Sequence, residues 1–179
     1  MSKFFKKYST FSDILIKWKK DNKKIVFTNG CFDILHRGHV EYLEKAKSYG
    51  DVLIVGLNSD KSVKKLKGKF RPYVGEDDRG YVLSGLQSVD AVVVFGEDTP
   101  HSLISNIIPD VLVKGGDYNI AEIVGRDIVE SNGGKVVTVK YINGKSSSSI
   151  IEKIKKSIWI KSVINWKYRK IIKWKYILY

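Results

Sequence analysis

The stretch TNGCFDILHRGHVEYL, residues 28–43, joins an apolar run to a helical pattern and holds two of the chain's three histidines. KKIVFTNG (23–30) predicts a buried strand, and VEYLEKAKSYG (40–50) predicts a helix that a final glycine stops. His36 and His39 therefore lie in a strand-to-helix turn. The helix N-terminus beside them has unpaired N–H groups and a partial positive charge, which make it a natural phosphate site.

Apolar, β-branched runs recur along the chain, with helical patterns between them. Strands that alternate with helices predict a Rossmann-like α/β fold, in which a five-stranded parallel sheet carries helices on both faces. The expected strands are 23–30, 51–58, 90–96, 110–116 and 134–141, and the other expected helices are 76–88, 99–107 and 120–131.

The segment KSVKKLKGKFRPYVGEDD (61–78) is too charged and glycine-bearing for a regular core element. We expect a long basic loop, which inside an α/β unit is more often functional than not. The segment follows the carboxyl end of a strand, where α/β sheets bind their ligands.

The net charge of +13 is concentrated at the two ends of the chain. Residues 1–24 carry eight lysines against two aspartates, and residues 151–179 carry nine basic residues against one glutamate. Residues 25–150 hold fifteen basic and sixteen acidic residues and are nearly neutral. A neutral middle argues against nucleic acid as the main partner.

The cysteine count and the hydropathy argue against disulfide-bonded, zinc-binding, membrane-spanning and secreted proteins. One cysteine cannot form an internal disulfide, and one cysteine with three histidines argues against a structural zinc cluster. No apolar run is long enough to span a membrane, and the N-terminus lacks the apolar region of a signal peptide. We therefore expect a cytoplasmic protein.

Composition divides the chain into three expected parts: a helical lead-in (1–22), the α/β domain (23–154) and a basic, aromatic extension (155–179). The extension interleaves tryptophan and tyrosine with lysine and has no single apolar helical face. Contact with a membrane surface, contact with nucleic acid, and packing on its own domain or on a partner all stay open. The last of these is favoured, and no function is built on the extension.

The two histidines have a chemical interpretation and a structural one. Gly30 lets the backbone approach a ligand and Gly38 permits a tight turn into the helix. Two imidazoles three residues apart can donate hydrogen bonds to one anion and stabilise charge that builds on a phosphoryl oxygen. Alternatively, one histidine caps the helix and the other faces solvent.

Thr28, Gly30, Phe32, Asp33, His36, Gly38 and His39 form the pattern T-x-G-x-F-D-x-x-H-x-G-H. This pattern resembles the signature of the cytidylyltransferase-like nucleotidyltransferases. LIVGLNSD (53–60), LKGKFRP (66–72), EDTP (97–100) and VKGGDY (113–118) follow in the order of one branch, the D-glycero-β-D-manno-heptose 1-phosphate adenylyltransferases. The similarity runs from about residue 12 to residue 154 and lacks the usual kinase half, so the chain resembles a stand-alone adenylyltransferase.

The resemblance implies that a sugar 1-phosphate attacks the α-phosphorus of ATP. ADP-heptose, a lipopolysaccharide-core precursor, and pyrophosphate would be the products, and Mg²⁺ would arrive on the ATP phosphates without a metal site in the protein. It further implies that His36, His39 and Lys67 are catalytic. A homodimer and a separate heptose kinase in the same pathway are expected by analogy.

The motifs give two further groups of expected site residues. Those expected to bind the nucleotide are Thr28, Asn29, Gly30, Phe32, Asp33, Gly38, Lys114, Gly115, Asp117, Gly144, Ser146, Ser147 and Ser148. Those expected at the substrate phosphate are Asn58, Lys65, Arg71 and Arg79. Several alternatives stay open: Asp33 orients a histidine or the turn itself, Asp117 caps a helix, Lys65 is solvated, and Arg79 pairs with its acidic neighbours.

YINGKSSSSII (141–151) is expected to be a second phosphate-binding element, with serines at a helix N-terminus. In the cytidylyltransferases this element reads RTxGxSTT. Tyr141 stands here at the position of the arginine, which leaves one cation fewer on the triphosphate and weakens a role for CTP.

Two other functions compete with this one. The first is the same chemistry with CTP and glycerol 3-phosphate. The second is a non-catalytic module that binds nucleic acid or a membrane through the basic ends, which predicts salt-sensitive binding that is lost without residues 151–179.

Overall fold

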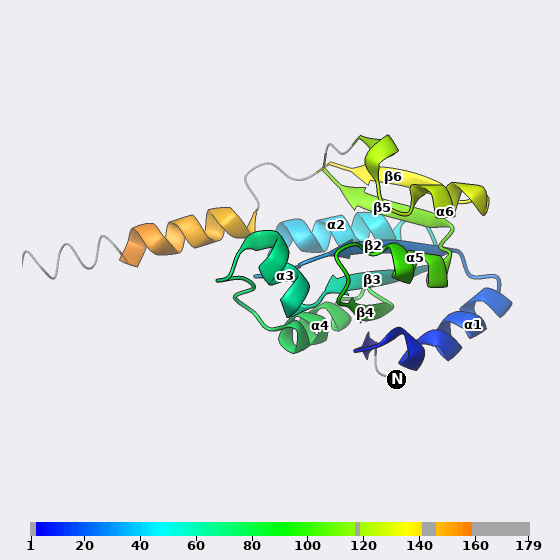
Figure 1. Cartoon of the computed structure of the whole chain (residues 1–179), viewed down its shortest axis with the longest axis horizontal. Helices are drawn as coiled ribbons and strands as arrows, with labels where there is room; N and C mark the ends of the chain where they lie inside the picture. The colour runs from blue at the N-terminus through cyan, green and yellow to red at the C-terminus, as the bar shows by residue number, and fades with distance from the viewer. Residues whose placement is uncertain (1–2, 117–118, 141–145, 159–179) are drawn as a thin grey trace, which may run out of the picture. The chain divides into compact units, whose positions relative to one another are not determined.

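The computed structural model describes residues 3–116, 119–140 and 146–158 (Figure 1). They fall into two units, Met1–Asn143 and Gly144–Tyr179. The first unit holds the sheet and the histidine turn. In the second, residues 147–158 form a helix. None of the helices in the described ranges is both long enough and apolar enough to cross a membrane.

Six parallel strands form one sheet in the order β1-β4-β3-β2-β5-β6 (Figure 1). Five were predicted: β2 (Ile25–Gly30), β3 (Val52–Asn58), β4 (Ala91–Phe95), β5 (Val111–Gly115) and β6 (Lys135–Val139). All seven residues of β3 are buried, as expected for a central strand covered on both faces. The sixth strand, β1 (Phe4–Phe5), corrects the expected count of five.

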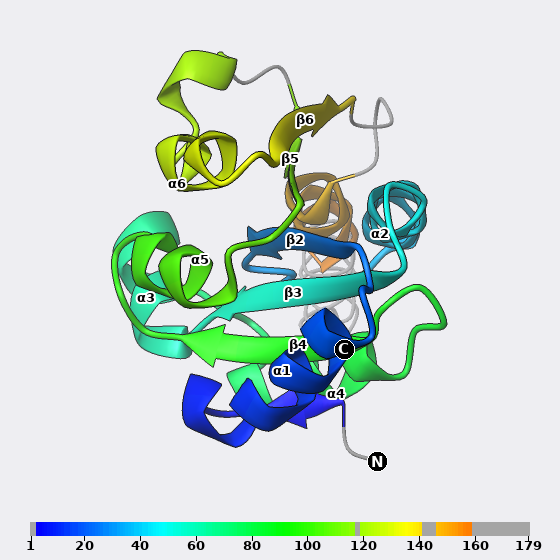
Figure 2. The ribbon, with the colours of Figure 1, turned by 90° about the vertical axis from the view of Figure 1, so that its right-hand side faces the viewer.

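Helices cover both faces of the sheet, as predicted. α1 (Ser12–Lys20), α5 (His101–Ile107) and α6 (Arg126–Ser131) pack on one face with Phe27 and Ile54. α2 (Arg37–Lys47) and α4 (Glu76–Ser84) pack on the other face with Val26 and Leu53. Figure 2 shows α2 and α5 on opposite sides of the strands. Short 3-10 turns lie at Tyr8–Thr10 (η1) and Ile120–Glu122 (η2).

The segment 61–78 is not one long loop, because α3 (Asp60–Lys67) occupies its first part. The Ser62 N–H donates to Ser59 Oγ at 3.2 Å and so caps the helix, while three lysines in its last turn favour the negative end of the helix dipole. Val63 anchors the helix in the interior. The loop itself comprises residues 68–75, and it begins where Gly68 adopts a φ of 98°.

All four predicted helices differ in their bounds. α4 ends at Ser84, four residues earlier than expected, and α5 begins at His101, two residues later than expected. α2 begins at Arg37, three residues earlier than expected, and ends at Lys47. Gly50, which was expected to end this helix, instead lets the backbone pack closely against Lys24. A Cβ at Gly50 would lie 2.7 Å from the Lys24 carbonyl oxygen. The expected helix 120–131 is interrupted at Gly125, whose φ of 84° separates η2 from α6.

Candidate active site

The histidine turn lies at the carboxyl edge of the sheet, beside its switch point. β2 pairs with β3 on one side and with β5 on the other. The chain runs outward from β2 through β3 to β4 and then returns to start β5 and β6. In open α/β sheets, the crevice at such a reversal, outside the carboxyl ends of the strands, is the usual ligand site.

Two residues of the turn adopt left-handed backbone conformations that only glycine takes without strain. Phe32 has a φ of 46° and Ile34 a φ of 54°. Such conformations cost on the order of 1–3 kcal/mol each and persist where the surroundings enforce them. The turn is therefore held by contacts outside itself.

Asp33 makes those contacts. Its carboxylate, with a fully buried side chain, accepts from Arg71 Nε at 2.7 Å, from the Tyr73 N–H at 2.9 Å and from the Val74 N–H at 3.0 Å. Of the two expected roles for Asp33, these bonds favour positioning of the turn, which they tie to the 68–75 loop.

His36 is the N-cap of α2. The Gly38 N–H donates to His36 Nδ1 at 3.1 Å. In the neutral ring the proton therefore lies on Nε2, which becomes a donor. Gly38 thus acts through its N–H as well as through its small size.

His39 packs between two rings. Its imidazole stacks on that of His36 with centroids 3.9 Å apart, and the edge of Phe32 meets it at 5.4 Å. The pKa of His39 is lowered to about 4, chiefly by burial and also by the charge of His36, while Asp33 partly opposes both. Within the described residues, His39 Nδ1 is buried without a hydrogen-bond partner. A neutral imidazole with an unpaired buried nitrogen is a group that a ligand can complete.

Gly30 also has a packing role, beside the expected approach of a ligand. A Cβ at this position would lie 3.0 Å from the Phe32 ring. The absence of a side chain at Gly30 thus makes room for the Phe32 ring, which packs edge-on against His39.

Thr28 is fully buried and supports the turn from below. Its hydroxyl lies 2.6 Å from the Tyr42 hydroxyl, which donates to the Val113 carbonyl oxygen at 3.2 Å. Thr28 therefore donates to Tyr42, and this chain of bonds joins α2 to β2 and β5. Sequence reasoning missed Tyr42, although a residue with an apolar ring and a polar tip on the core side of a helix was a usable signal.

Lys114 reaches from β5 to β2, where its ammonium donates to Asn29 Oδ1. Burial lowers the pKa of Lys114 to about 8. Gly115 follows as the last residue of β5, and the Gly116 N–H donates to the Val139 carbonyl oxygen at 2.9 Å.

The basic residues after β3 are divided between surface and interior. Lys65 is exposed and pairs with Asp98. Burial raises the pKa of the Cys31 thiol and the charge of Lys67 opposes that rise, which places the exposed Lys67 near the turn. Arg71, with 18% of its side chain exposed, is paired with Asp33.

Arg79 is engaged in the interior, which differs from the expected phosphate contact. Its guanidinium, only 1% exposed, donates to Asp60 Oδ1 at 2.7 Å and to the carbonyl oxygens of Asn58, Val74 and Cys31. Asn58 is buried too, and its amide donates to Ser62 Oγ at 2.9 Å. Arg79 thus links the turn, β3, α3 and the 68–75 loop, and Asn58 links β3 to α3.

The second expected phosphate element is described in part. Asp117 and Gly144 lie outside the described residues. The Ser149 N–H donates to Ser146 Oγ at 3.1 Å, and the Ser146 N–H donates to Ser149 Oγ at 3.3 Å. This reciprocal pair caps the helix that begins at Ser147, so capping accounts for two of the four serines. Ser148 is exposed in the first turn of that helix.

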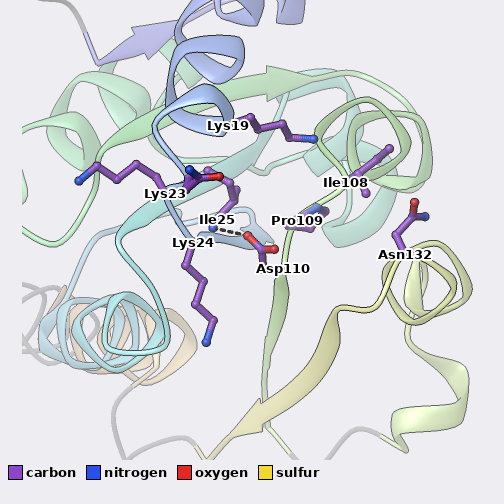
Figure 3. A pocket seen from close by; sticks show the side chains of 9 residues that line it. Lys19, Lys23, Lys24, Ile25, Ile108, Pro109, Asp110 and Asn132 are labelled. Atoms are coloured by element: carbon purple, nitrogen blue, oxygen red, sulfur yellow. Dashed lines mark hydrogen bonds between the residues drawn. The ribbon is translucent and has the colours of Figure 1, made fainter.

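A hollow of about 470 Å³ lies at the opposite, amino edge of the sheet (Figure 3). Figure 3 shows Lys19, Lys23 and Lys24 pointing in different directions around it. The Asp110 carboxylate is already engaged by the Ile25 N–H at 2.6 Å. The lysines do not converge on one point, so the histidine turn is the stronger candidate. The lining residues are Lys19, Asn22, Lys23, Lys24, Ile25, Ile108, Pro109, Asp110 and Asn132.

A family model described as cytidylyltransferase-like matches residues 27–164. Two curated proteins named bifunctional protein HldE are similar to the chain. That of Geobacter sulfurreducens is 51% identical over 152 residues, which are 85% of this chain and 31% of the relative. That of Geobacter metallireducens is 58% identical over 136 residues, which are 76% of this chain and 28% of the relative. The chain spans less than a third of the length of either relative.

Two solved structures share the fold. A lipopolysaccharide core biosynthesis protein from Thermoplasma volcanium superposes with a TM-score of 0.58 at 27% identity, over 69% of this chain and 99% of that one. A pantoate-beta-alanine ligase from Francisella tularensis superposes with a TM-score of 0.57 over 83% of this chain and 69% of that one. Its identity of 16% makes this second likeness one of fold alone.

Proposed function

The chain belongs to the cytidylyltransferase-like family, and on that premise we propose that it is a nucleotidyltransferase that moves the adenylyl group of ATP onto D-glycero-β-D-manno-heptose 1-phosphate. The products are ADP-heptose and pyrophosphate. The observation that carries the proposal is the stacked imidazole pair at the N-terminus of α2. In this pair His36 caps the helix, and His39 Nδ1 is buried without a hydrogen-bond partner among the described residues.

The choice of substrates is supported by motifs and relatives. The LKGKFRP, EDTP and VKGGDY segments resemble the heptose branch, and the chain is similar to two HldE proteins and to a lipopolysaccharide core biosynthesis protein. Tyr141, where cytidylyltransferases carry an arginine, favours ATP over CTP.

In the proposed reaction an oxygen of the sugar phosphate attacks the α-phosphorus of ATP. The bond from that phosphorus to the oxygen bridging to the β-phosphate breaks, and pyrophosphate leaves with the electron pair. Such a transfer depends on positioning and charge neutralisation more than on an acid or base. His36 donates through Nε2–H, because its Nδ1 accepts from Gly38. Neutral His39 adds a donor without repelling His36.

The other expected residues form two groups, those that would contact phosphate and those that bond to the protein and position the turn. Lys67, whose side chain is exposed, would contact phosphate. Thr28, Asp33, Asn58 and Arg79 are placed to position the turn, since their polar atoms bond to the protein. Arg71 would reach a phosphate only by exchanging its bond to Asp33.

Mg²⁺ would enter with ATP. Across residues 3–116, 119–140 and 146–158, no three or more His, Cys, Asp or Glu side chains gather to hold a metal, and the charges that act on Cys31 of the turn are three basic groups, Lys67, Arg71 and Arg79, and the single carboxylate of Asp33. This donor set fits a cation carried by the substrate, which supplies charge neutralisation on the phosphates. The homodimer and the separate heptose kinase remain part of the proposal, and light scattering checks the first.

The test is pyrophosphate release with Mg²⁺ from ATP or CTP, each paired with heptose 1-phosphate or glycerol 3-phosphate. Release only from ATP with heptose 1-phosphate supports the proposal. Turnover with CTP and glycerol 3-phosphate would keep the chemistry and replace the substrates. No release from any pair, with ATP still bound, would reject the heptose assignment.

A further inference from the structure

Resting on the proposed function, we propose that Lys114 is the cation that holds the triphosphate of ATP at the switch point of the sheet. The inference concerns which group neutralises the nucleotide's phosphates, and it starts from where strand pairing places this side chain.

Lys114 and Asn29 stand at the same level of adjacent strands. Phe27 of β2 pairs with Leu112 of β5, and both belong to the core cluster on the α5 side. Two residues further on, Asn29 and Lys114 point to the same face and form their hydrogen bond. That bond therefore crosses the switch point, directly before the chain enters the histidine turn.

The surroundings of the Lys114 ammonium are neutral as far as the structure describes them. Its hydrogen-bond partner among the described residues is the Asn29 amide, and its neighbour in register on β6 is Thr138. Burial lowers the pKa of Lys114, and no charged side chain among the described residues contributes to the shift. A desolvated cation with only a neutral partner is costly, and an anion would relieve that cost.

A purely structural tie between β2 and β5 does not need a charge. Two neutral side chains would join the strands without the desolvation of an ammonium. The positive charge of Lys114 would instead neutralise a polyanion bound at the carboxyl edge of the sheet. At this edge Asn29, which bonds to Lys114, directly precedes the histidine turn.

The expected binding behaviour follows from the ammonium. Bound phosphate raises the pKa of Lys114, so ATP binding above pH 8 takes up a proton and weakens as pH rises. With a free pKa of about 8, affinity for ATP should fall roughly tenfold between pH 7.5 and pH 9. Adenosine, which has no phosphate, should show no such fall.

The experiment measures ATP and adenosine affinities by titration calorimetry at both pH values, with thermal unfolding as a check on folding. Lys114→Met should weaken ATP binding at pH 7.5 about 10- to 100-fold and leave adenosine binding within about twofold. Lys114→Arg should keep most of the affinity and lose the fall towards pH 9, because arginine stays charged. Lys135→Met, an exposed lysine on β6, is the matched control and should change neither affinity.

Equal losses of ATP and adenosine binding in Lys114→Met would overturn the proposal in favour of a structural role. Unchanged ATP affinity in a folded Lys114→Met protein would also overturn it, while pyrophosphate release by the wild type would leave the proposed function standing. A wild type that binds no ATP would overturn both.

Discussion

The imidazole rings of His36 and His39 stack with centroids 3.9 Å apart and planes 23° from parallel. Two rings this close cannot both carry a charge without strong repulsion. At most one of the two rings therefore carries a charge, and in the proposed function the pair would present hydrogen-bond donors to a single anion.

We expect each histidine to contribute mainly to turnover. His36→Asn keeps an N-cap acceptor for the Gly38 N–H and loses the Nε2 donor, and His39→Gln keeps a neutral polar side chain. Each variant should lower kcat about 100- to 1,000-fold, since a positioned donor to a developing oxyanion has that effect. Steady-state pyrophosphate release measures this. His36→Ala should in addition lose about 1 kcal/mol of stability with its cap, and near-normal rates in both His36→Asn and His39→Gln would reject the phosphate-binding account.

Stability should depend on pH through His39. Its pKa is about 4 in the folded chain, below the ordinary value of 6.5, so the unfolded chain binds the proton more readily between these values. The contribution of His39 is therefore fully present above pH 6.5 and is lost as pH falls towards 4, by at most about 3 kcal/mol. Urea unfolding of the wild type and His39→Gln at pH 4.5 and pH 7 measures the difference. Parallel pH profiles of the two proteins would contradict the burial of this imidazole.

Asp33 should matter more to the fold than its partner Arg71. Removing the carboxylate leaves a partly buried guanidinium and two backbone N–H groups without their acceptor. Asp33→Ala should therefore lower the free energy of unfolding by about 3–5 kcal/mol, and Arg71→Ala by less, because Asp33 keeps the N–H donors of Tyr73 and Val74. Urea unfolding ranks the two, and trypsin should cut faster in the 68–75 loop of Asp33→Ala. An equal loss in both variants would show that the ion pair alone holds the turn.

Substitution of Arg79 tests whether this residue stabilises the fold or contacts the substrate phosphate. Its donors meet Asp60 and three carbonyl oxygens, so Arg79→Met should destabilise the chain by several kcal/mol, on the order of 3. Arg79→Lys should recover little, because an ammonium cannot reach the same partners in a fork. A stable Arg79→Met protein with a raised KM for the sugar phosphate would restore the phosphate contact that the sequence predicted.

Much of the fold could be predicted because its signals are local. β2 to β6 are apolar runs with turn residues between them, and α2 begins where a capping residue precedes a helical pattern. α3 was missed, because a short helix rich in lysine differs from a loop only through the Ser59 cap and the burial of Val63. β1 was missed because two residues carry no period.

The candidate site was predicted less completely, because its supports are far apart in sequence. Asp33 meets the N–H groups of Tyr73 and Val74, about forty positions further along the chain. Lys114 meets Asn29 across 85 positions. No spacing rule reaches that distance, so motif reasoning found the residues without finding which of them contact one another.

β1, although only two residues long, protects the edge of the sheet against pairing with other chains. The Val92 N–H donates to the Lys3 carbonyl oxygen at 2.7 Å, and the Phe4 ring lies where a side chain at Gly80 would otherwise be. These contacts cover the outer edge of β4, and an uncovered strand edge is a template for pairing with other chains. A chain shortened to begin at residue 6 would keep α1 and the histidine turn and expose that edge. Its first failure would be aggregation, while the chemistry of each folded molecule stayed intact.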